Sequence, residues 1–501
     1  MALAETRDNS SGALSVPRGL IYFTDKNGNA TSVALNKDFP VIYAVPSEIQ
    51  KSFASSSEGL LSGITAVARK ISNVSGRPVD EIIKRLMKKN DQYELLIQKA
   101  TADDAARIRA ENMKGVYVKD RTFRNYPFQG LASHLLGFVS PVNEGEDQKT
   151  GNAGVGRYGL ELYFNKELAG KIGQLNGGTL INGKDGVDLN STIDINIQRE
   201  AEDVLKKLIE EYGASGGTLI VEEPTTGGIL AMTNSPDFDP NDYSKFSIDK
   251  FLNPAVQSVY EPGSIFKLIT MSAGIDSGKI TPETTYYDTG SFTANKKTIT
   301  NWDFKEHGAY GKATMTNVIE HSINTGAVFA EKTTGNDIFY NYLLKFGING
   351  QTGITLPGEV RGSINNLKHG HEIDFATAAY GQGVSVTPIE LITAVSAIAN
   401  GGVLMKPYIL ANQIPEATRR VISTGTSKAV TKMMISAVEK NIIAAIPNYT
   451  IAGKTGTAFI PNFGKHGYTD QVINSYIGFA PASDAKFIIL IKLDRDRKSV
   501  V

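Results

Sequence analysis

Three short polar strings lie far apart in this chain, and a fold in which they act together must bring them to one place. They are Ser264-Ile265-Phe266-Lys267, Ser322-Ile323-Asn324 and Lys454-Thr455-Gly456-Thr457. Taken singly, each is typical of an ordinary element: a capped helix start, a turn, and a strand that ends in a turn. Their order and wide separation favour a shared chemical role, because a chance match would have to satisfy all three settings at once.

The first string has the composition of an activated nucleophile. Serine reacts poorly at neutral pH unless a base removes its proton as it attacks an acyl carbon. Pro262-Gly263 precedes Ser264 and an apolar run follows it, so we predict that Ser264 opens a buried helix. Residues three apart share a helix face, which places the Lys267 amine beside the Ser264 hydroxyl. Lys267 is therefore the predicted base.

A lysine base needs a lowered pKa. A free lysine titrates at about 10.4 and would be protonated at neutral pH. Burial and a nearby positive charge lower the pKa of a lysine, and Lys454 is the predicted positive neighbour of Lys267. Bringing this pKa to about 7–8 costs roughly 3–4 kcal/mol. We expect Ser322 to bridge the two amines and pass a proton to the leaving group, and Asn324 to orient a peptide-like substrate.

The third string predicts the edge of a substrate cleft. Thr450–Phe459 is a predicted strand, and Gly456 removes a side chain so that substrate backbone can lie against it. The hydroxyls of Thr455 and Thr457, together with Lys454, suit a substrate carboxylate. The backbone N–H groups of Ser264 and Thr457 are candidate oxyanion donors, each contributing about 3–4 kcal/mol.

Composition and charge narrow the classes of function. At 501 residues the chain is expected to form two or three domains. Lys plus Arg and Asp plus Glu each total 52, so the formal charge is zero and no nucleic-acid partner is expected. The absence of cysteine excludes disulfides, thiolate metal sites and a cysteine nucleophile. No apolar run approaches the roughly 18 residues that a membrane helix requires.

Strand and helix patterns divide the chain into two regions. The strands predicted in the first region are Gly19–Thr24, Val41–Val45 and Tyr93–Ala100. Its predicted helices are Glu58–Ile71, Val79–Lys89 and a segment from an N-cap at Thr101 to about Met113. Asn143–Gly156 is rich in glycine, asparagine and charge, which predicts a loop. We place the domain boundary before an amphipathic helix predicted at Asp194–Tyr212.

The second region begins and ends with strands around a largely helical middle. Gly217–Val221 and Gly228–Thr233 predict a hairpin. Thr450–Phe459, Ser475–Phe479 and Lys486–Leu493 predict three more strands near the C-terminus. The predicted fold class is therefore α+β, with a five-stranded antiparallel sheet flanked by helices.

The three strings and their surroundings resemble class B penicillin-binding proteins, which are monofunctional peptidoglycan transpeptidases. Around the strings, the resemblance is carried by Tyr260-Glu261-Pro262-Gly263-Ser264 and Gly453-Lys454-Thr455-Gly456-Thr457-Ala458. Elsewhere it is carried by Pro17-Arg18-Gly19-Leu20-Ile21-Tyr22, Arg124-Asn125-Tyr126-Pro127, His134-Leu135-Leu136-Gly137-Phe138, Gly159-Leu160-Glu161, Gly227-Gly228-Ile229-Leu230-Ala231-Met232, Gly381-Gln382-Gly383 with Thr387-Pro388, and Gly478-Phe479-Ala480-Pro481. The resemblance implies an elongated N-terminal pedestal of the dimerisation type at residues 18–190 and a transpeptidase domain at residues 191–501.

The resemblance also implies a ping-pong acyl transfer. Ser264 would attack the penultimate D-Ala of a stem pentapeptide, expel the terminal D-Ala and hold an acyl-enzyme, which an amine of a neighbouring stem peptide resolves into a cross-link. β-Lactams would acylate the same serine, and no metal or cofactor is required. The implied catalytic residues are Ser264, Lys267, Ser322 and Lys454, and the implied substrate-binding residues are Asn324, Thr455, Gly456 and Thr457.

Members of this family work at the cell membrane. They begin with a short cytoplasmic tail and one membrane helix, expose the catalytic domain outside the cytoplasm, and work beside a membrane glycosyltransferase. Residues 1–17 of this chain are instead predicted to be a disordered lead-in without that anchor. Family members also continue past the last strand into a helix, whereas this chain stops at Asp494–Val501, so we expect that helix to be missing.

Other functions stay open on the residues alone. A carboxypeptidase or β-lactamase-like hydrolase would hand the acyl group to water, and a non-catalytic β-lactam sensor or scaffold would share the fold; the long pedestal and the two lysines favour the transpeptidase. Gly453-Lys454-Thr455 imitates a phosphate loop, but Asn448 stands where that motif needs its first glycine. His369-Gly370-His371-Glu372 suggests a metal site yet lacks a third ligand, so a solvated loop is predicted.

Overall fold

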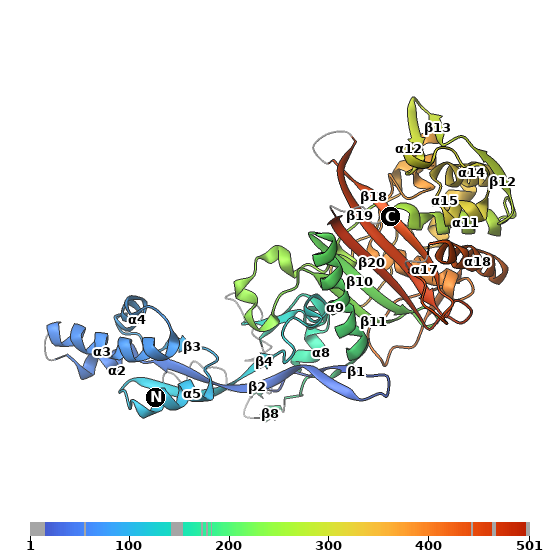
Figure 1. The fold of residues 1–501 in the computed structure, drawn as a ribbon. Coiled ribbons are helices and arrows are strands. Elements are labelled where there is room, and N and C mark those ends of the chain that lie inside the picture. Colours follow the sequence, from blue (N-terminus) through green and yellow to red (C-terminus); the bar gives the residue numbers. More distant parts are fainter. Residues whose placement is uncertain are drawn as a thin grey trace.

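The computed structural model describes residues 16–54, 57–141, 154–171, 174–176, 179–181, 183–441, 444–462 and 467–496. The predicted lead-in at residues 1–17 and the predicted loop at 143–156 lie largely outside these residues, as does the chain end after residue 496. The molecule is elongated: an N-terminal arm of strands and helices leads to a larger part that holds a sheet of green and red strands and its helices (Figure 1).

A long strand forms the spine of the N-terminal arm, whose elements from β1 to β9 we call the pedestal. Strand β2 (Ala30–Ala44) pairs antiparallel with β1 (Ile21–Thr24), β3 (Glu94–Ile97) and β4 (Val116–Asn125). The sequence predicted only the Val41–Val45 end of β2 and missed β4. Part of this pairing is polar, as at Asp38 and Thr122, whose side chains are hydrogen-bonded at 2.6 Å, and these residues interrupt the apolar alternation that marks a strand.

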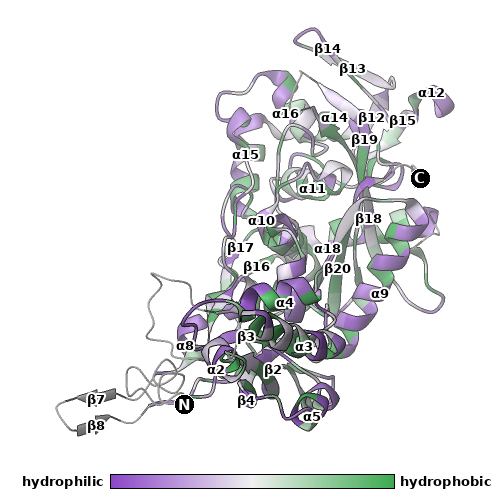
Figure 2. Cartoon of the chain, turned by 90° about the vertical axis from the view of Figure 1, so that its left-hand side faces the viewer, coloured by the Kyte–Doolittle hydropathy of each residue, from purple (hydrophilic) through white to green (hydrophobic). Residues whose placement is uncertain are grey.

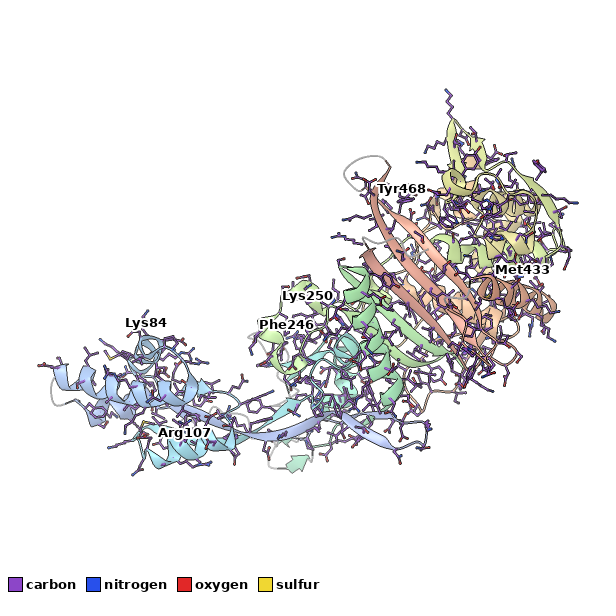
Figure 3. All side chains as sticks on the ribbon, in the orientation of Figure 1. Lys84, Arg107, Phe246, Lys250, Met433 and Tyr468 are labelled. Carbon is purple, nitrogen blue, oxygen red and sulfur yellow. The ribbon has the colours of Figure 1, made fainter. Side chains whose placement is uncertain are left out.

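Four helices surround the far end of this spine, and we call them the head helices. They are α2 (Pro46–Ser52), α3 (Ser57–Ser75), α4 (Val79–Leu86) and α5 (Ala102–Ala110). Their apolar faces form a core cluster of their own, which includes Ile42, Ile64 and Ile108. The predicted cap at Thr101 is confirmed, because its hydroxyl accepts from the Asp104 N–H at 3.0 Å. Lys84 and Arg107 project from this end of the molecule (Figure 3).

A buried carboxylate joins three segments of the pedestal. Glu161 lies on α7 (Gly159–Tyr163) and accepts hydrogen bonds from Arg18 Nε at 2.8 Å and Arg124 Nε at 2.7 Å. The Tyr126 hydroxyl donates to the same carboxylate at 3.2 Å. Burial by itself would raise the pKa of Glu161, but the two guanidinium groups outweigh it and hold this pKa below its usual value. The charge of Glu161 is therefore fully compensated inside the pedestal.

The pedestal continues into the C-terminal part without a break. Strand β9 (Leu189–Asp194) pairs in parallel with β1 and leads directly into α9 (Ile195–Tyr212). The Asp194 carboxylate caps that helix by accepting from the Asn196 N–H at 2.8 Å. One apolar cluster holds residues of both parts, such as Phe23 and Phe266. The boundary predicted between residues 190 and 191 falls within β9.

The C-terminal part is built on the predicted five-stranded antiparallel sheet, whose strand order is β11-β10-β20-β19-β18. The strands are β10 (Gly216–Glu223), β11 (Gly228–Ser235), β18 (Ala452–Pro461), β19 (Tyr468–Ala480) and β20 (Phe487–Asp496). The predicted hairpin of β10 and β11 is confirmed. Strand β19 begins at Tyr468, near the tip of the sheet (Figure 3), and not at the predicted Ser475. The sequence missed its first residues because they are polar and largely exposed.

Helices cover both faces of this sheet. Helix α9 packs on one face through Leu205 against Leu219 and Leu493, and Figure 2 shows hydrophilic and hydrophobic residues alternating along it. The other face carries α17 (Pro388–Ala399), which contacts β10 and β20, and α18 (Thr424–Lys440), which contacts β18. Helix α11 (Lys267–Asp276) packs on α18 and on α14 (Asn324–Thr334), and the turn that leads into α11 packs on β18.

Shorter elements complete the described chain. In the pedestal they are α6 (Ser133–Leu136), β5 (Phe138–Ser140), β6 (Val155–Arg157), α8 (Asn165–Ala169), β7 (Gln174–Asn176) and β8 (Thr179–Ile181). In the C-terminal part they are η2 (Pro240–Lys245), η3 (Ile248–Phe251), α10 (Pro254–Gln257), η4 (Gly263–Phe266), β12 (Thr285–Asp288), β13 (Ser291–Ala294), β14 (Lys297–Thr300), α12 (Phe304–His307), β15 (Gly311–Thr314), α13 (Met315–Glu320), α15 (Asn336–Lys345), η5 (Asn365–Leu367), α16 (Glu372–Ala378), β16 (Val403–Met405) and β17 (Ala417–Arg420). Here η marks a 3-10 helix.

The Glu161 cluster generates a stability prediction. Glu161→Ala leaves two buried guanidinium groups without their counter-charge, so we expect the free energy of unfolding to fall by about 3–5 kcal/mol. Because the pKa of Glu161 is lowered on folding, its contribution is fully present above the pKa of an unfolded glutamate, about 4.3, and is lost as the pH falls through the lower folded pKa. Chemical denaturation at several pH values measures both effects.

Glu167→Ala is the matched control for this experiment. It removes an exposed carboxylate from the neighbouring helix α8. We expect it to change the free energy of unfolding by less than about 0.5 kcal/mol. Equal losses in the two variants would contradict the role given to Glu161.

Candidate active site

The predicted nucleophile lies at the start of a buried helix, as the sequence indicated. Ser264 lies in η4, a single 3-10 turn that continues into α11, and it is partly exposed. Lys267 is the first residue of α11 and has no exposed surface. No side-chain hydrogen bond from Ser264 is found within the described residues, so its hydroxyl is free to approach an acyl carbon.

Two glycines let β18 approach this turn closely. A Cβ at Gly263 would lie 2.5 Å from the Thr457 carbonyl oxygen, and one at Gly456 would lie 3.1 Å from the Pro262 carbonyl oxygen. Gly263 also has a φ of +59°, which favours glycine. The sequence led us to expect substrate backbone beside Gly456, whereas the turn that carries Ser264 packs there. This packing places the Thr457 backbone next to the residue that precedes Ser264.

The second string lies between α13 and α14. Ser322 has a φ of +56°, an uncommon conformation for a residue with a side chain. We predicted a loop for both of its polar residues, but Asn324 is the first residue of α14. Asn324 Oδ1 accepts from Lys267 Nζ at 2.8 Å, and Asn324 Nδ2 donates to the Thr300 carbonyl at 3.0 Å. The amide that we expected to orient a substrate is thus bound on both sides by the protein.

The two lysines meet at Ser322. Lys267 Nζ donates to the Ser322 carbonyl and lies 3.2 Å from Ser322 Oγ. Lys454, which is 3% exposed, places its Nζ 3.0 Å from the same hydroxyl oxygen. The hydroxyl therefore bridges the two amines, which is the arrangement that the sequence predicted.

Burial is the main cause of the pKa shifts of both lysines. It lowers the pKa of Lys267 well below the usual value for lysine; the charge of Lys454 adds to this effect, and the carboxylate of Asp303 opposes it. Burial also lowers the pKa of Lys454 to about 7. Both shifts favour the neutral amine more than in a lysine exposed to water, which is the direction that a general base requires.

Buried and exposed residues alternate through the third string, as expected for a strand. Lys454 and Gly456 are buried, whereas Thr455 and Thr457 are exposed. Thr455 Oγ1 lies 3.4 Å from Lys454 Nζ, which keeps this hydroxyl beside the amine. The Thr457 hydroxyl donates to Asn474 Oδ1 on β19 at 2.9 Å. Thr455 and Lys454 are thus close enough to bind one ligand group together.

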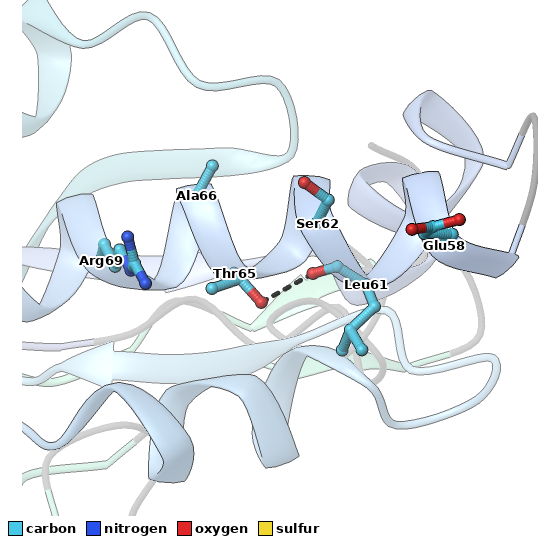
Figure 4. Close-up of a pocket in the computed structure, with 6 residues that line it drawn as sticks. All are labelled: Glu58, Leu61, Ser62, Thr65, Ala66 and Arg69. Atoms are coloured by element: carbon cyan, nitrogen blue, oxygen red, sulfur yellow. Dashed lines mark hydrogen bonds between the residues drawn. The ribbon is translucent and has the colours of Figure 1, made fainter.

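Two other features lie away from this cluster. A hollow of about 580 Å³ follows the exposed side of α3, and its lining residues come from that one helix (Figure 4). Figure 1 places α3 among the head helices, at the opposite end of the molecule from α11. His371, from the sequence that suggested a metal, immediately precedes α16 as its N-cap residue, and the described residues contain no cluster of three His, Asp or Glu side chains suited to a metal ion.

Known proteins share both the sequence and the fold described above. Residues 217–499 match the family described as the penicillin binding protein transpeptidase domain, and residues 13–185 match the penicillin-binding protein dimerisation domain. The chain is 31% identical over 509 residues to stage V sporulation protein D of Bacillus subtilis, which covers 95% of this chain and 74% of that protein. The chain belongs to the class B penicillin-binding proteins.

Further similarities agree with this family. The chain is 28% identical to the peptidoglycan D,D-transpeptidase FtsI homolog of Mesostigma viride, over 83% of this chain and 75% of that protein. The crystal structure of penicillin binding protein 2X from Streptococcus thermophilus has a TM-score of 0.75 at 22% identity, covering 97% of this chain and 77% of that one, which shows the same fold. The protein is a peptidoglycan D,D-transpeptidase, a serine acyltransferase of cell wall synthesis whose substrate is peptidoglycan and whose transpeptidase domain binds β-lactams.

Sequence analysis of this penicillin-binding protein missed one charged neighbour of the site. Asp303 is buried, receives a hydrogen bond from the Tyr310 hydroxyl, and its charge acts on the pKa of Lys267. No spacing relates Asp303 to the three strings, because it comes from the segment between the first two. An aspartate next to the single tryptophan of the chain, Trp302, was the only signal available in the sequence.

The close approach of β18 to η4 can be tested by adding one methyl group. Gly263→Ala introduces a Cβ that meets the Thr457 carbonyl oxygen, so we expect β18 to be displaced and penicillin acylation to slow by more than about tenfold. The positive φ at this residue adds a stability loss of about 1–2 kcal/mol. Fluorescent penicillin labelling gives the rate, and thermal denaturation gives the stability.

Gly278→Ala is the control for that variant. Gly278 has a φ of +70°, but no atom lies within 4 Å of a Cβ built there. Both variants therefore carry the backbone strain, and only Gly263→Ala carries the clash. If the two variants were acylated at the same rate, the close approach would have no catalytic importance.

Proposed function

We propose that Ser264 is the nucleophile of this transpeptidase and that Lys267 is the base that takes its proton. The arrangement that supports this is the meeting of two buried amines at one hydroxyl. A neutral Lys267 amine has two N–H donors, which suit Asn324 Oδ1 and the Ser322 carbonyl, and one lone pair. The lone pair is then left for a hydroxyl proton.

The acyl transfer follows in two balanced steps. In the first, Ser264 Oγ forms a bond to the carbonyl carbon of the penultimate D-Ala, its proton passes to Lys267, and the peptide C–N bond breaks. Lys267 then passes this proton through Ser322, which lies between the two amines, to the leaving amine of the terminal D-Ala, and Lys267 is neutral again. In the second step an acceptor amine bonds to the acyl carbon and loses a proton, and Ser264 Oγ leaves with a proton.

Substrate binding is assigned to the edge of β18. Thr455 and Lys454 lie close enough to hold the terminal carboxylate, and the neighbouring Thr457 offers a second hydroxyl. The backbone N–H groups of Ser264 and Thr457 are the proposed oxyanion donors. Gly456 lets this strand lie against the nucleophile turn, and Asn324 holds Lys267 in place while bordering the substrate.

The wider setting is proposed from the family. We place the pedestal at residues 18–190, the transpeptidase domain at residues 191–501, and the enzyme at the outer face of the cell membrane beside a membrane glycosyltransferase. The elongated pedestal supports this, because it separates the active site from the head helices (Figure 1). Among the described helices, none combines the length and the apolar character needed to cross a bilayer.

A covalent adduct tests the nucleophile. Incubation with a fluorescent penicillin should add the mass of one penicillin to the wild type and none to Ser264→Ala, because the acyl bond forms on the Ser264 hydroxyl. Ser277→Ala, which removes a hydroxyl just beyond the end of α11, should be labelled like the wild type. Intact-protein mass spectrometry gives all three results, and an equal adduct on Ser264→Ala would refute the assignment. An adduct lost from the wild type within seconds would favour a hydrolase.

A charge-removal variant tests the role of Lys454. Lys454→Met retains much of the side-chain length but removes the charge that lowers the pKa of Lys267. The pKa of Lys267 should rise. The acidic side of the pH–rate profile of acylation, which we call the acid limb, should therefore move to higher pH, and the acylation rate near pH 7 should fall by about tenfold or more. Lys486→Met, at an exposed lysine, should leave the profile unchanged. A limb that stays in place or moves to lower pH would rule out this coupling.

A further inference from the structure

A buried carboxylate outside the three strings lies on a segment that is hydrogen-bonded to the residues around the Lys267 amine. Asp303 is 7% exposed, and its Oδ1 atom is buried with no hydrogen-bond partner. Buried polar atoms of this kind are few in native proteins and call for a physical reason. The carboxylate of Asp303 raises the pKa of Lys267, against the larger effect of burial. The buried, unpaired oxygen and this charge effect suggest that Asp303 acts on Lys267.

The segment that carries Asp303 is tied to the second string. Trp302 Nε1 donates to the His321 carbonyl at 3.3 Å, one residue before Ser322. The Thr300 carbonyl accepts from Asn324 Nδ2 at 3.0 Å. Residues 300–303 therefore lie against the segment that holds Ser322 and Asn324, the two residues that accept hydrogen bonds from Lys267.

A second buried carboxylate holds the partner of Asp303. The Tyr310 hydroxyl donates to Asp303 Oδ2, and the Tyr310 backbone N–H donates to Asp288 Oδ2 at 2.8 Å. Asp288 is 1% exposed and also accepts from Thr325 Oγ1 at 2.6 Å and Asn301 Nδ2 at 3.0 Å. Asp288 thus fixes the backbone of Tyr310, and the hydroxyl of Tyr310 then orients Asp303.

The charges around the Lys267 amine come from two sides. Lys454 on β18 supplies a positive charge, and Asp303 supplies a negative one. The titratable rings that border Asp303 through Tyr310 are His307, stacked on Tyr310 with ring centroids 4.2 Å apart, and His321, whose ring centroid lies 5.1 Å from that of Tyr310. Asp303 and Lys454 therefore have opposite electrostatic effects on Lys267.

We propose that Asp303, oriented by Tyr310, is a positioning residue for Lys267 whose negative charge stabilises the amine in the protonated form that it takes after accepting the Ser264 proton. The proposal rests on the proposed roles of Ser264 and Lys267. Burial and Lys454 favour the neutral amine, which can accept a proton but holds it weakly. Asp303 opposes them by favouring the protonated amine. Lys267 is then a strong enough base to accept the Ser264 proton, while part of the molecules still carry it in the neutral form.

The pH dependence of acylation tests this proposal. The rate of Ser264 labelling by a fluorescent penicillin would be measured from acid to alkaline pH for the wild type, Asp303→Asn and Asp303→Glu. Loss of the negative charge favours neutral Lys267, so the acid limb of Asp303→Asn should move to lower pH by about one unit. Its maximal rate should fall about tenfold, because a weaker base drives the attack less well. Asp303→Glu restores the charge and should return the limb toward the wild type.

Glu306→Gln is the matched control, because it removes an exposed carboxylate from the adjoining helix α12. Its limb should coincide with that of the wild type. An Asp303→Asn limb that coincides with the wild type, or that moves to higher pH, overturns the proposal while leaving the role of Ser264 intact. A wild type that is not acylated overturns the proposed nucleophile and this inference with it.

A second variant applies if Asp303→Asn does not fold. Tyr310→Phe retains both carboxylates and the ring, and removes only the hydroxyl that orients Asp303. The carboxylate is then less well directed at Lys267, so the limb should move to lower pH by a smaller amount. An unchanged limb in a folded Tyr310→Phe variant overturns the proposal.

Discussion

The amines of Lys267 and Lys454 are both buried beside the Ser322 hydroxyl. The elements around them must hold these three groups together. Moving a lysine from water into a protein interior is unfavourable, and two lysines beside each other add repulsion. The protein offsets this with oxygen acceptors: the Ser322 carbonyl and Asn324 Oδ1 for Lys267, and the Thr455 carbonyl for Lys454. The unfavourable burial is retained because it gives Lys267 the lowered pKa on which its proposed role as a base depends.

Backbone geometry, more than side-chain length, brings the three strings together. Gly263 and Gly456 remove side chains where the nucleophile turn meets the edge strand, so the two backbones can touch. Ser322 adopts a positive φ, which directs both its carbonyl and its hydroxyl at the amines. A small displacement of β18 would separate Lys454 from Ser322, so the site depends on the pairing that holds β18 in the sheet.

The sequence predicted the sheet and the site cluster because their signals are local. Strands β10 and β20 are apolar runs, α9 has one apolar face, and the strings place serine and lysine at helical spacing. Strand β4 and most of β2 were missed because these two strands pair with each other over a partly exposed stretch, where no core imposes an apolar pattern on the sequence. Asp303 was missed for a different reason: hydrogen bonds from Trp302 to His321 and from Asn324 to Thr300 bring its segment to the second string, and these tertiary contacts leave no periodic signal in the sequence.

The unbroken strand β2 gives the molecule a mechanical property. At about 3.3 Å per residue, its 15 residues span roughly 50 Å from the pedestal base to the head helices. Its pairing with β1, and the parallel pairing of β1 with β9, join that strand to the helix that covers the catalytic sheet. Hydrogen-bonded strands therefore join the head helices to the catalytic part without a break, which gives force a continuous path along the arm.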